Sequence, residues 1–335
     1  MDNTSPKKID AVFEGGGVKG SGLVGAIAVA EELGYQFENV AGTSAGAIVA
    51  SLIAAGYTAA ELKGIMDEID YQAFKDRGVL GRIPLIGLLA QFVVKKGIYE
   101  GSFFEEWIRG LLSRKGVRTF GDLWQPKYKD DPVFCCRLQV VVSDISRGRL
   151  IVLPRDSADY GIKPEELDIA GAVRMSMSLP FFYKPVKMRT REGTTSYLVD
   201  GGILSNFPIW LLDDGSDDPE WPTIGFKLVE PEEGKPHQIF GPVTLFAALF
   251  STMMEAHDAR YIQDVNFMRT IPIPTLGVQT TEFHLSQERR DALYRSGVSA
   301  AEEFFQHWDF ELFKQANRDR ERMHRRESVW QKGNG

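Results

Sequence analysis

The stretch VAGTSAGAIVASLIAAG, residues 40–56, places Ser44 between two glycines, after a short apolar run and before an alanine-rich one. Its centre, Gly42 to Gly46 (GTSAG), fits the Gly-x-Ser-x-Gly nucleophile elbow, in which the chain turns sharply from a strand into a helix. Glycine leaves room at such a crowded turn, and the helix N-terminus favours negative charge beside the serine oxygen. The motif predicts that Ser44 is a nucleophile; the other interpretation is a glycine- and alanine-rich packing turn.

The segments around this stretch alternate between strand and helix patterns. Ile9–Phe13 predicts a strand that runs into a glycine loop, Gly22–Leu33 predicts a helix, and residues 37–43 predict a second strand before a helix over Ala45–Ala55. Such alternation, with short loops at strand ends, indicates a largely parallel sheet covered by helices.

Further elements are expected along the rest of the chain. Strand patterns occupy Arg137–Asp144, Arg149–Leu153, 196–202 and 223–230, and helix patterns occupy 59–69, Ser102–Leu112, 164–178 and the region from Ser286 onward.

The glycine loop GGGVKG, residues 15–20, has two functional interpretations. It fits the dinucleotide fingerprint, but that site needs an acid at the end of the next strand, and Glu38 lies before the apolar part of that strand. A Walker loop is excluded because Lys19 precedes Gly20 instead of following it.

An oxyanion hole fits the loop better. Consecutive glycines, here Gly15, Gly16 and Gly17, let backbone N–H groups point at one spot, and each such donor contributes about 3–4 kcal/mol to transition-state stabilisation. Lys19 would add positive charge nearby. A plain glycine turn is the other interpretation.

The base for Ser44 is the next question. Asp200 ends the strand-like YLV and precedes two glycines, which would let it approach another loop closely, although Asp-Gly turns are common. None of the five histidines stands in a glycine-rich loop at a strand end, where an α/β-hydrolase holds its base: His237, His257, His284, His307 and His324. A carboxylate is therefore the expected base, and Asp200 is the candidate.

Composition excludes several functional classes. The net charge of −7 argues against sequence-independent nucleic-acid binding, and two adjacent cysteines, Cys135 and Cys136, can build neither a disulfide framework nor a four-thiolate zinc site.

The N-terminus lacks the apolar core of a signal peptide. The apolar runs Ile83–Val94 and Ile239–Met254 fall short of the roughly 18–20 residues that a transmembrane helix needs. We expect a cytoplasmic protein in a reducing compartment.

Three motifs in order, GGGVKG, GTSAG and DGG, resemble the patatin-like phospholipase family. The resemblance runs from about Ile9 to Pro208 and includes LVGAIAVAEELGY (residues 23–35), AVRMSMSLPFFYKPV (172–186) and DGGILSNFP, with Asn206 at an expected place. It implies a three-layer α/β fold with a mainly parallel central sheet flanked by helices.

The resemblance also implies the site. Ser44 is the nucleophile and Asp200 its general base in a dyad without histidine, and no metal or other cofactor is required. Gly15, Gly16 and Gly17, assisted by Lys19, form the oxyanion hole. The supporting motif positions are Gly20, Gly42, Gly46, Gly201 and Gly202. Glu14 and Lys19 stand where the family often has Asp and Arg, and DGG replaces the DGA of many members.

A dyad of this kind needs a buried carboxylate. An exposed aspartate has a pKa of about 3.9 and accepts a serine proton poorly, whereas burial against apolar walls raises the pKa. The expected reaction is attack by Ser44 on an ester carbonyl, loss of the alcohol, and release of the acid by water that Asp200 activates.

The implied substrate is a phospholipid or lysophospholipid, met through transient contact with a membrane surface. Residues 79–99 are interpreted as an acyl-binding or interface-seeking flap or as a buried helix, and residues 244–254 as core that could also suit acyl chains. The charged tail could touch anionic headgroups or form a solvated face. Headgroup, ester position, activator and oligomeric state stay open.

The expected organisation is a catalytic domain over residues 9–210, strands and helices over 211–315 on the same body, and a charged tail over 316–335. Two alternatives remain beside a lipid acyl hydrolase. One is an acyltransferase that uses the same acyl-enzyme, and the other is a non-catalytic lipid- or nucleotide-binding module.

Overall fold

A computed structural model describes residues 7–68, 97–216, 218–230, 264–280 and 285–319, together with positions 239, 241, 248, 249, 252, 253 and 282. Most of residues 79–99, interpreted above as a flap or a buried helix, and most of residues 244–254 therefore lie outside the described residues, as does the tail from residue 320. Four of the five histidines lie outside them too: His237, His257, His284 and His324.

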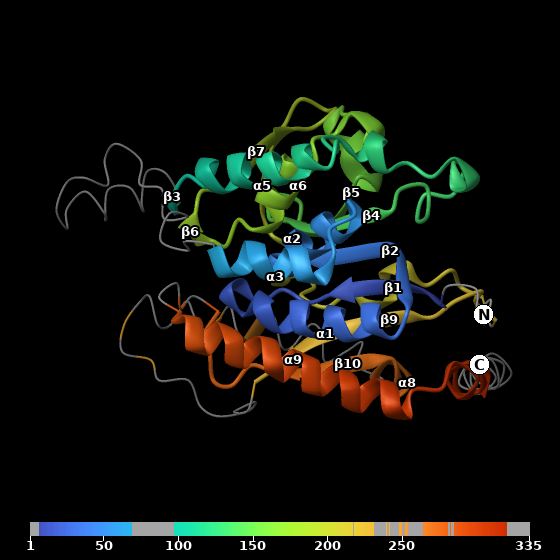
Figure 1. Ribbon diagram of the computed structural model, residues 1–335. Coiled ribbons are helices and arrows are strands. Elements are labelled where there is room, and N and C mark those ends of the chain that lie inside the picture. The colour runs from blue at the N-terminus through green and yellow to red at the C-terminus, as the bar shows by residue number, and fades with distance from the viewer. Residues whose placement is uncertain are drawn as a thin grey trace, which may run out of the picture.

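A mixed sheet forms the centre of the described chain (Figure 1). Seven of its eight strands follow the order β10 (Thr270–Pro274), β9 (Thr223–Val229), β1 (Lys7–Phe13), β2 (Tyr35–Thr43), β4 (Leu138–Asp144), β8 (Thr195–Asp200), β7 (Val186–Arg189), and β5 (Arg149–Leu153) pairs with β4. The five strands from β10 to β4 are parallel, while β8 and β5 run antiparallel to β4. All seven residues of β4 are buried, as a central strand covered on both faces requires.

Strand β4 carries two strands end to end along one edge. β5 pairs with residues 140–144 of β4, so it occupies one whole edge there. β2 pairs with residues 138–141 and β8 with residues 142–144, and both must lie on the other edge. The carboxyl end of β2 therefore meets the carboxyl end of β8: Thr43 pairs with Val141, and Asp200 pairs with Val142.

Alternate residues of the strands face two separate apolar cores, as the period of two dictates. Ile9 and Phe13 of β1 join the larger core, which is built with helices α1 (Gly20–Glu32), α2 (Ala45–Ala54), α3 (Ala59–Glu68), α5 (Ser102–Arg114), α6 (Ile169–Ser176) and α9 (Gln287–His307). Val12 faces the other way, into a smaller core that Phe207 and the 3₁₀ turn Ile209–Leu212 cover. The sheet is thus covered on both faces.

Glycines let helix α9 pack closely on α1. A Cβ added at Gly297 would lie 1.9 Å from the carbonyl oxygen of Gly22, and one added at Gly25 would lie 2.0 Å from that of Tyr294. Figure 1 shows α3, α1 and α9 side by side. β9 pairs with β1, β10 pairs with β9, and α9 packs on α1, so these three later elements contact the N-terminal elements directly.

Helix α6 begins later than the sequence pattern predicts. Residues 164–166 form a 3₁₀ turn, and the α-helix starts at Ile169, after the cap residue Asp168. The prediction of one helix from residue 164 was wrong because the chain is held extended there: Phe120 N–H donates to the Leu167 carbonyl at 3.0 Å, and Thr119 bridges to Asp168.

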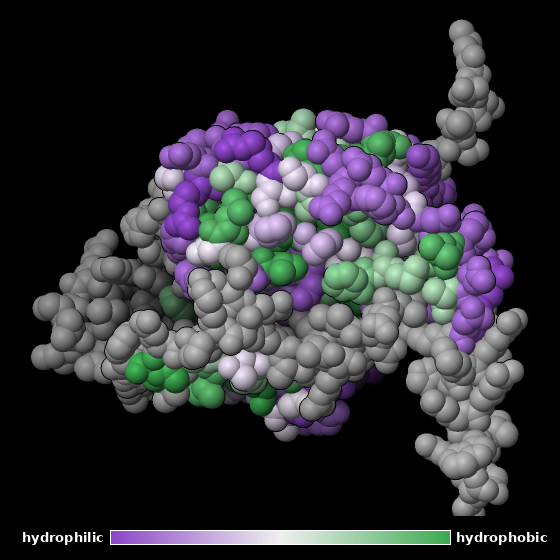
Figure 2. All heavy atoms as spheres, turned by 90° about the horizontal axis from the view of Figure 1, so that it is seen from below, coloured by the Kyte–Doolittle hydropathy of each residue, from purple (hydrophilic) through white to green (hydrophobic). Residues whose placement is uncertain are grey.

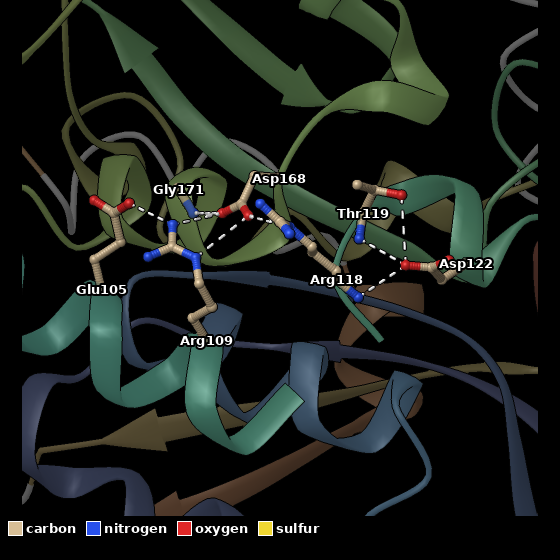
Figure 3. Close-up of polar contacts among 7 residues, drawn as sticks. All are labelled: Glu105, Arg109, Arg118, Thr119, Asp122, Asp168 and Gly171. Atoms are coloured by element: carbon tan, nitrogen blue, oxygen red, sulfur yellow. Dashed lines mark hydrogen bonds and ion pairs between the residues drawn. The ribbon is translucent and has the colours of Figure 1, made fainter. Parts of the chain in front are cut away.

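Helix α5 anchors the start of α6 (Figure 3). The Asp168 carboxylate accepts the Gly171 N–H at 2.8 Å and a guanidinium N–H of Arg109 at 3.0 Å, and Arg109 also pairs with Glu105 at 2.6 Å. A side-chain cap of this kind stabilises a helix by about 1 kcal/mol. The N-terminus of α6 is therefore fixed to its neighbour.

The surface of the described chain carries no large apolar block on the face shown in Figure 2, where hydrophobic residues form small groups separated by hydrophilic ones. Within the described parts of the chain, none of the helices combines the length and the apolarity needed to cross a bilayer.

Candidate active site

Ser44 stands at a sharp turn between β2 and α2, as the motif predicts. Its backbone has φ 54° and ψ −123°, a left-handed conformation that is strained for a residue with a side chain. The flanking glycines are needed for space: a Cβ at Gly42 would lie 2.3 Å from the Gly46 carbonyl oxygen, and one at Gly46 would lie 2.1 Å from that of Phe13.

The side chains of Ser44 and Asp200 meet. Ser44 Oγ donates to Asp200 Oδ2 at 2.8 Å, and the Gly202 N–H donates to Asp200 Oδ1 at 2.8 Å. Gly201 lies against β4, where a Cβ would be 2.4 Å from the Val141 carbonyl oxygen. The glycine pair after Asp200 thus lets this loop reach the elbow.

Burial sets the acidity of Asp200, which is only 3% exposed. Desolvation raises the pKa of its carboxyl to about 7, although hydrogen bonds from the Gly202 N–H and the Ser44 hydroxyl act in the lowering direction. A carboxyl with this pKa can take a proton from a hydroxyl near neutral pH far better than an exposed one.

The glycine loop lies beside the dyad. A Cβ at Gly15 would be 3.1 Å from Ser44 Cβ, which places the loop against Ser44. The Gly15 N–H donates to the main-chain carbonyl of Asn206 at 3.2 Å, and Asn206 Nδ2 donates back to the Gly15 carbonyl at 3.0 Å. Neither Gly16 nor Gly17 donates its N–H to another described residue. Gly17 has φ +58°, a conformation that favours glycine.

Two charged side chains beside the glycine loop, those of Lys19 and Glu14, bind residues other than Ser44 and Asp200. Lys19, whose side chain is 6% exposed, pairs with Glu230 at 2.8 Å. Glu14 accepts the Asn206 amide at 3.2 Å and the Leu228 N–H. The Lys19 charge is thus neutralised at the end of β9, while Glu14 and Asn206 tie the glycine loop to the Asp200 loop.

The described residues place no histidine at the dyad. His307 is the histidine among them; it lies on α9, where its ring nitrogen contacts the Glu303 carbonyl at 2.9 Å. The sequence did not predict several contacts near Ser44. Met177 Sδ lies 3.5 Å from Ser44 Oγ, and the Asn206 clamp is formed by a residue that the sequence marked only by its place in DGGILSNFP. The segment MSMS, residues 175–178, gave no signal of a role beyond its resemblance to a family block.

The fold and the site define an α/β protein that brings a serine and a buried aspartate together at a strand-to-helix elbow. A family model described as Patatin-like phospholipase matches residues 11–213. The chain belongs to the patatin-like phospholipase family.

Relatives extend this assignment over most of the chain. The uncharacterized protein YqhO of Bacillus subtilis is 42% identical over 307 residues, which cover 90% of this chain and 99% of the relative. A cUMP-AMP-activated phospholipase of Escherichia coli is 27% identical over 202 residues, covering 58% of this chain and 55% of the relative. VipD from Legionella pneumophila has a similar fold, with a TM-score of 0.56 at 19% identity, over 91% of this chain and 68% of that one.

The raised pKa of Asp200 predicts a pH-dependent difference in stability between the wild type and Asp200→Asn. Between about pH 4 and pH 7 the folded state holds a proton on Asp200 that the unfolded chain has released, so rising pH removes stability from the wild type. We expect the free energy of unfolding of the wild type, relative to Asp200→Asn, to fall across this range in urea titrations. A difference that does not change with pH would contradict the buried, protonated carboxyl.

Proposed function

We propose that this protein is a lipid acyl hydrolase of the phospholipase A or lysophospholipase type, which cleaves carboxylic esters of membrane phospholipids with a Ser44–Asp200 dyad. The observation that carries the proposal is the 2.8 Å hydrogen bond from the Ser44 hydroxyl to a carboxylate that is almost fully buried. Membership of a phospholipase family supplies the substrate class.

The geometry supports the following acylation step. Ser44 Oγ attacks the ester carbonyl carbon while its proton passes to Asp200 Oδ2, the atom that it already contacts at 2.8 Å. Negative charge develops on the carbonyl oxygen. We assign its stabilisation to the N–H groups of Gly16 and Gly17, each contributing about 3–4 kcal/mol. Gly15 supports the loop through Asn206, and Lys19 contributes through the ion pair that fixes the loop.

Loss of the alcohol completes acylation, and deacylation by water then returns the site to its starting state. The bond from the carbonyl carbon to the alcohol oxygen breaks, and the alcohol takes the proton from Asp200. Asp200 then removes a proton from a water molecule that attacks the acyl-Ser44 carbonyl. The fatty acid leaves as Ser44 regains its proton. The same acyl-enzyme would serve an acyltransferase if an alcohol replaced water, and product analysis separates the two reactions.

Exposed apolar side chains support contact between the active-site edge and a lipid surface. Ile145 follows the carboxyl end of β4 and is 51% exposed, and Leu276 follows that of β10 and is 49% exposed. Because β4, β10 and β2 are parallel, their carboxyl ends lie along one edge of the sheet. Ile145 and Leu276 therefore lie at the same edge as Ser44, which follows the carboxyl end of β2. Apolar side chains at this edge can enter the acyl boundary of a membrane.

Ser44→Ala and Asp200→Asn should remove fatty-acid release from phospholipid vesicles. Loss of the nucleophile prevents the acyl-enzyme, and loss of a general base costs about 10²- to 10⁴-fold. Asp10→Asn is the matched control, because Asp10 is also buried and its pKa is also raised to about 7 by desolvation, while its Oδ1 binds the Asn39 amide at 2.8 Å. We expect that variant to retain the wild-type rate; equal rates in all four proteins would exclude the proposed function.

The rate should depend on pH through Asp200. Only the ionised carboxylate accepts the serine proton, so kcat/KM should rise about tenfold per pH unit below the pKa of about 7 and level off above it. The measurement is hydrolysis of a soluble ester between pH 5 and pH 9, in the wild type and in Asp10→Asn. A profile without a midpoint near 7 in either protein would contradict Asp200 as the base.

Ile145→Asp and Leu276→Asp should lower hydrolysis of vesicles about tenfold but leave hydrolysis of a soluble monomeric ester unchanged, because charge at the membrane boundary opposes docking and not chemistry. The control is Phe267→Asp. Phe267 is 63% exposed and lies on α8 (Asp264–Met268), which precedes β10 and so lies at the opposite edge of the sheet. An equal loss in the control variant, or none in the first two, would refute the docking edge.

A further inference from the structure

The turn that ends α6, residues 176–178, contacts both members of the dyad. The Ser44 N–H donates to Ser176 Oγ at 2.8 Å, and the Asp200 N–H donates to the Ser178 carbonyl oxygen at 3.0 Å. We propose that Ser176 is a positioning residue for the nucleophile and that this turn fixes Ser44 and Asp200 relative to each other. The proposal deepens the hydrolase function and rests on it.

The position of Ser44 creates the need for Ser176. Ser44 is the N-cap of α2, so its N–H has no acceptor within that helix, and an N–H that is shielded from water without an acceptor costs about 1–3 kcal/mol. Ser176 is fully buried, so its hydroxyl, rather than bulk water, is the acceptor.

The direction of the hydrogen bonds is fixed. The Ser176 hydroxyl has one proton, which it donates to the Val141 carbonyl oxygen at 2.7 Å. Its lone pairs are therefore left for the Ser44 N–H. Val141 pairs with Thr43 and precedes Val142, which pairs with Asp200. Ser176 thus joins α6, β4 and the elbow at the level where β2 and β8 meet.

The turn at residues 176–178 is fixed by hydrogen bonds from Arg174. Arg174, only 5% exposed, donates to Ser178 Oγ and to the main-chain carbonyls of Glu100 and Lys184, the last at 3.1 Å. The other end of α6 is capped by Asp168, which Arg109 holds (Figure 3). A helix fixed at both ends can keep Ser176 in place when a substrate enters.

For catalysis, this means that the Ser44 N–H and the N–H groups of the glycine loop have different acceptors. Because Ser176 occupies the Ser44 N–H, that group cannot serve the oxyanion. Without the Ser176 hydroxyl, the backbone at Ser44 loses the hydrogen bond that fixes it, and the Ser44 Oγ atom can move away from Asp200 Oδ2. The expected loss is in kcat, since the dyad is misaligned while the surfaces that bind substrate are untouched.

Ser176→Ala tests this, with Ser51→Ala as the matched control. Ser51 is also fully buried, and its hydroxyl donates to the Ile48 carbonyl at 2.8 Å, within α2. We expect Ser176→Ala to lower kcat of ester hydrolysis about 10- to 100-fold with less than a threefold change in KM. Ser176→Thr, which keeps the hydroxyl, should restore kcat to within about fivefold of wild type, and Ser51→Ala should leave it unchanged.

Hydrogen exchange of the Ser44 amide, followed by NMR in the same proteins, separates this proposal from the hydrolase function because it needs no turnover. We expect exchange at least tenfold faster in Ser176→Ala than in the wild type and Ser51→Ala. Unchanged exchange in Ser176→Ala, or a kcat within twofold of wild type, would overturn the positioning role. A wild type without ester hydrolysis would refute the function, and the exchange rates alone would then decide the role of Ser176.

Discussion

The site depends on one arrangement of strands: β2 and β8 share a single edge of β4 and meet there with their carboxyl ends. Thr43 and Asp200 pair with consecutive residues of β4, Val141 and Val142. This pairing places Ser44, the residue after Thr43, next to Asp200. Residues 156 positions apart are thereby placed in contact by backbone hydrogen bonds. A buried strand holds this register firmly, because a slip by one residue would turn every side chain of β8 to the wrong face.

Burial alone does not make an aspartate catalytic. Asp10 and Asp200 are both enclosed, and desolvation raises the pKa of each to about 7. The Asp10 carboxylate faces the main-chain and side-chain N–H groups of Asn39, whereas Asp200 faces a hydroxyl. Only the second arrangement can move a proton to and from a reacting oxygen. The neighbour, and not the pKa, distinguishes the structural carboxylate from the catalytic candidate.

The sequence predicted those parts of the site that local chemistry encodes. GTSAG predicts a strand-to-helix turn because few sequences tolerate that backbone, and Ser44 indeed lies between β2 and α2. The family and the mainly parallel, helix-covered sheet were confirmed. Sequence could not give the antiparallel entry of β8, because strand direction depends on pairing partners and not on residue period. Nor could the sequence identify Ser176. Its hydrogen-bond donor, the Ser44 N–H, is distant in the sequence, and nothing in the residues around Ser176 indicates this partner.

The hydrogen bonds of the N–H groups around Ser44 support the oxyanion hole that we propose. The Ser44 N–H is bound by Ser176, and the Gly15 N–H is bound by Asn206. Backbone donors in a partly buried site need acceptors. The N–H groups of Gly16 and Gly17 have no acceptor among the described residues, and a carbonyl oxygen of a substrate held by Ser44 is a chemically suitable one. We therefore propose that these two N–H groups bind the oxyanion.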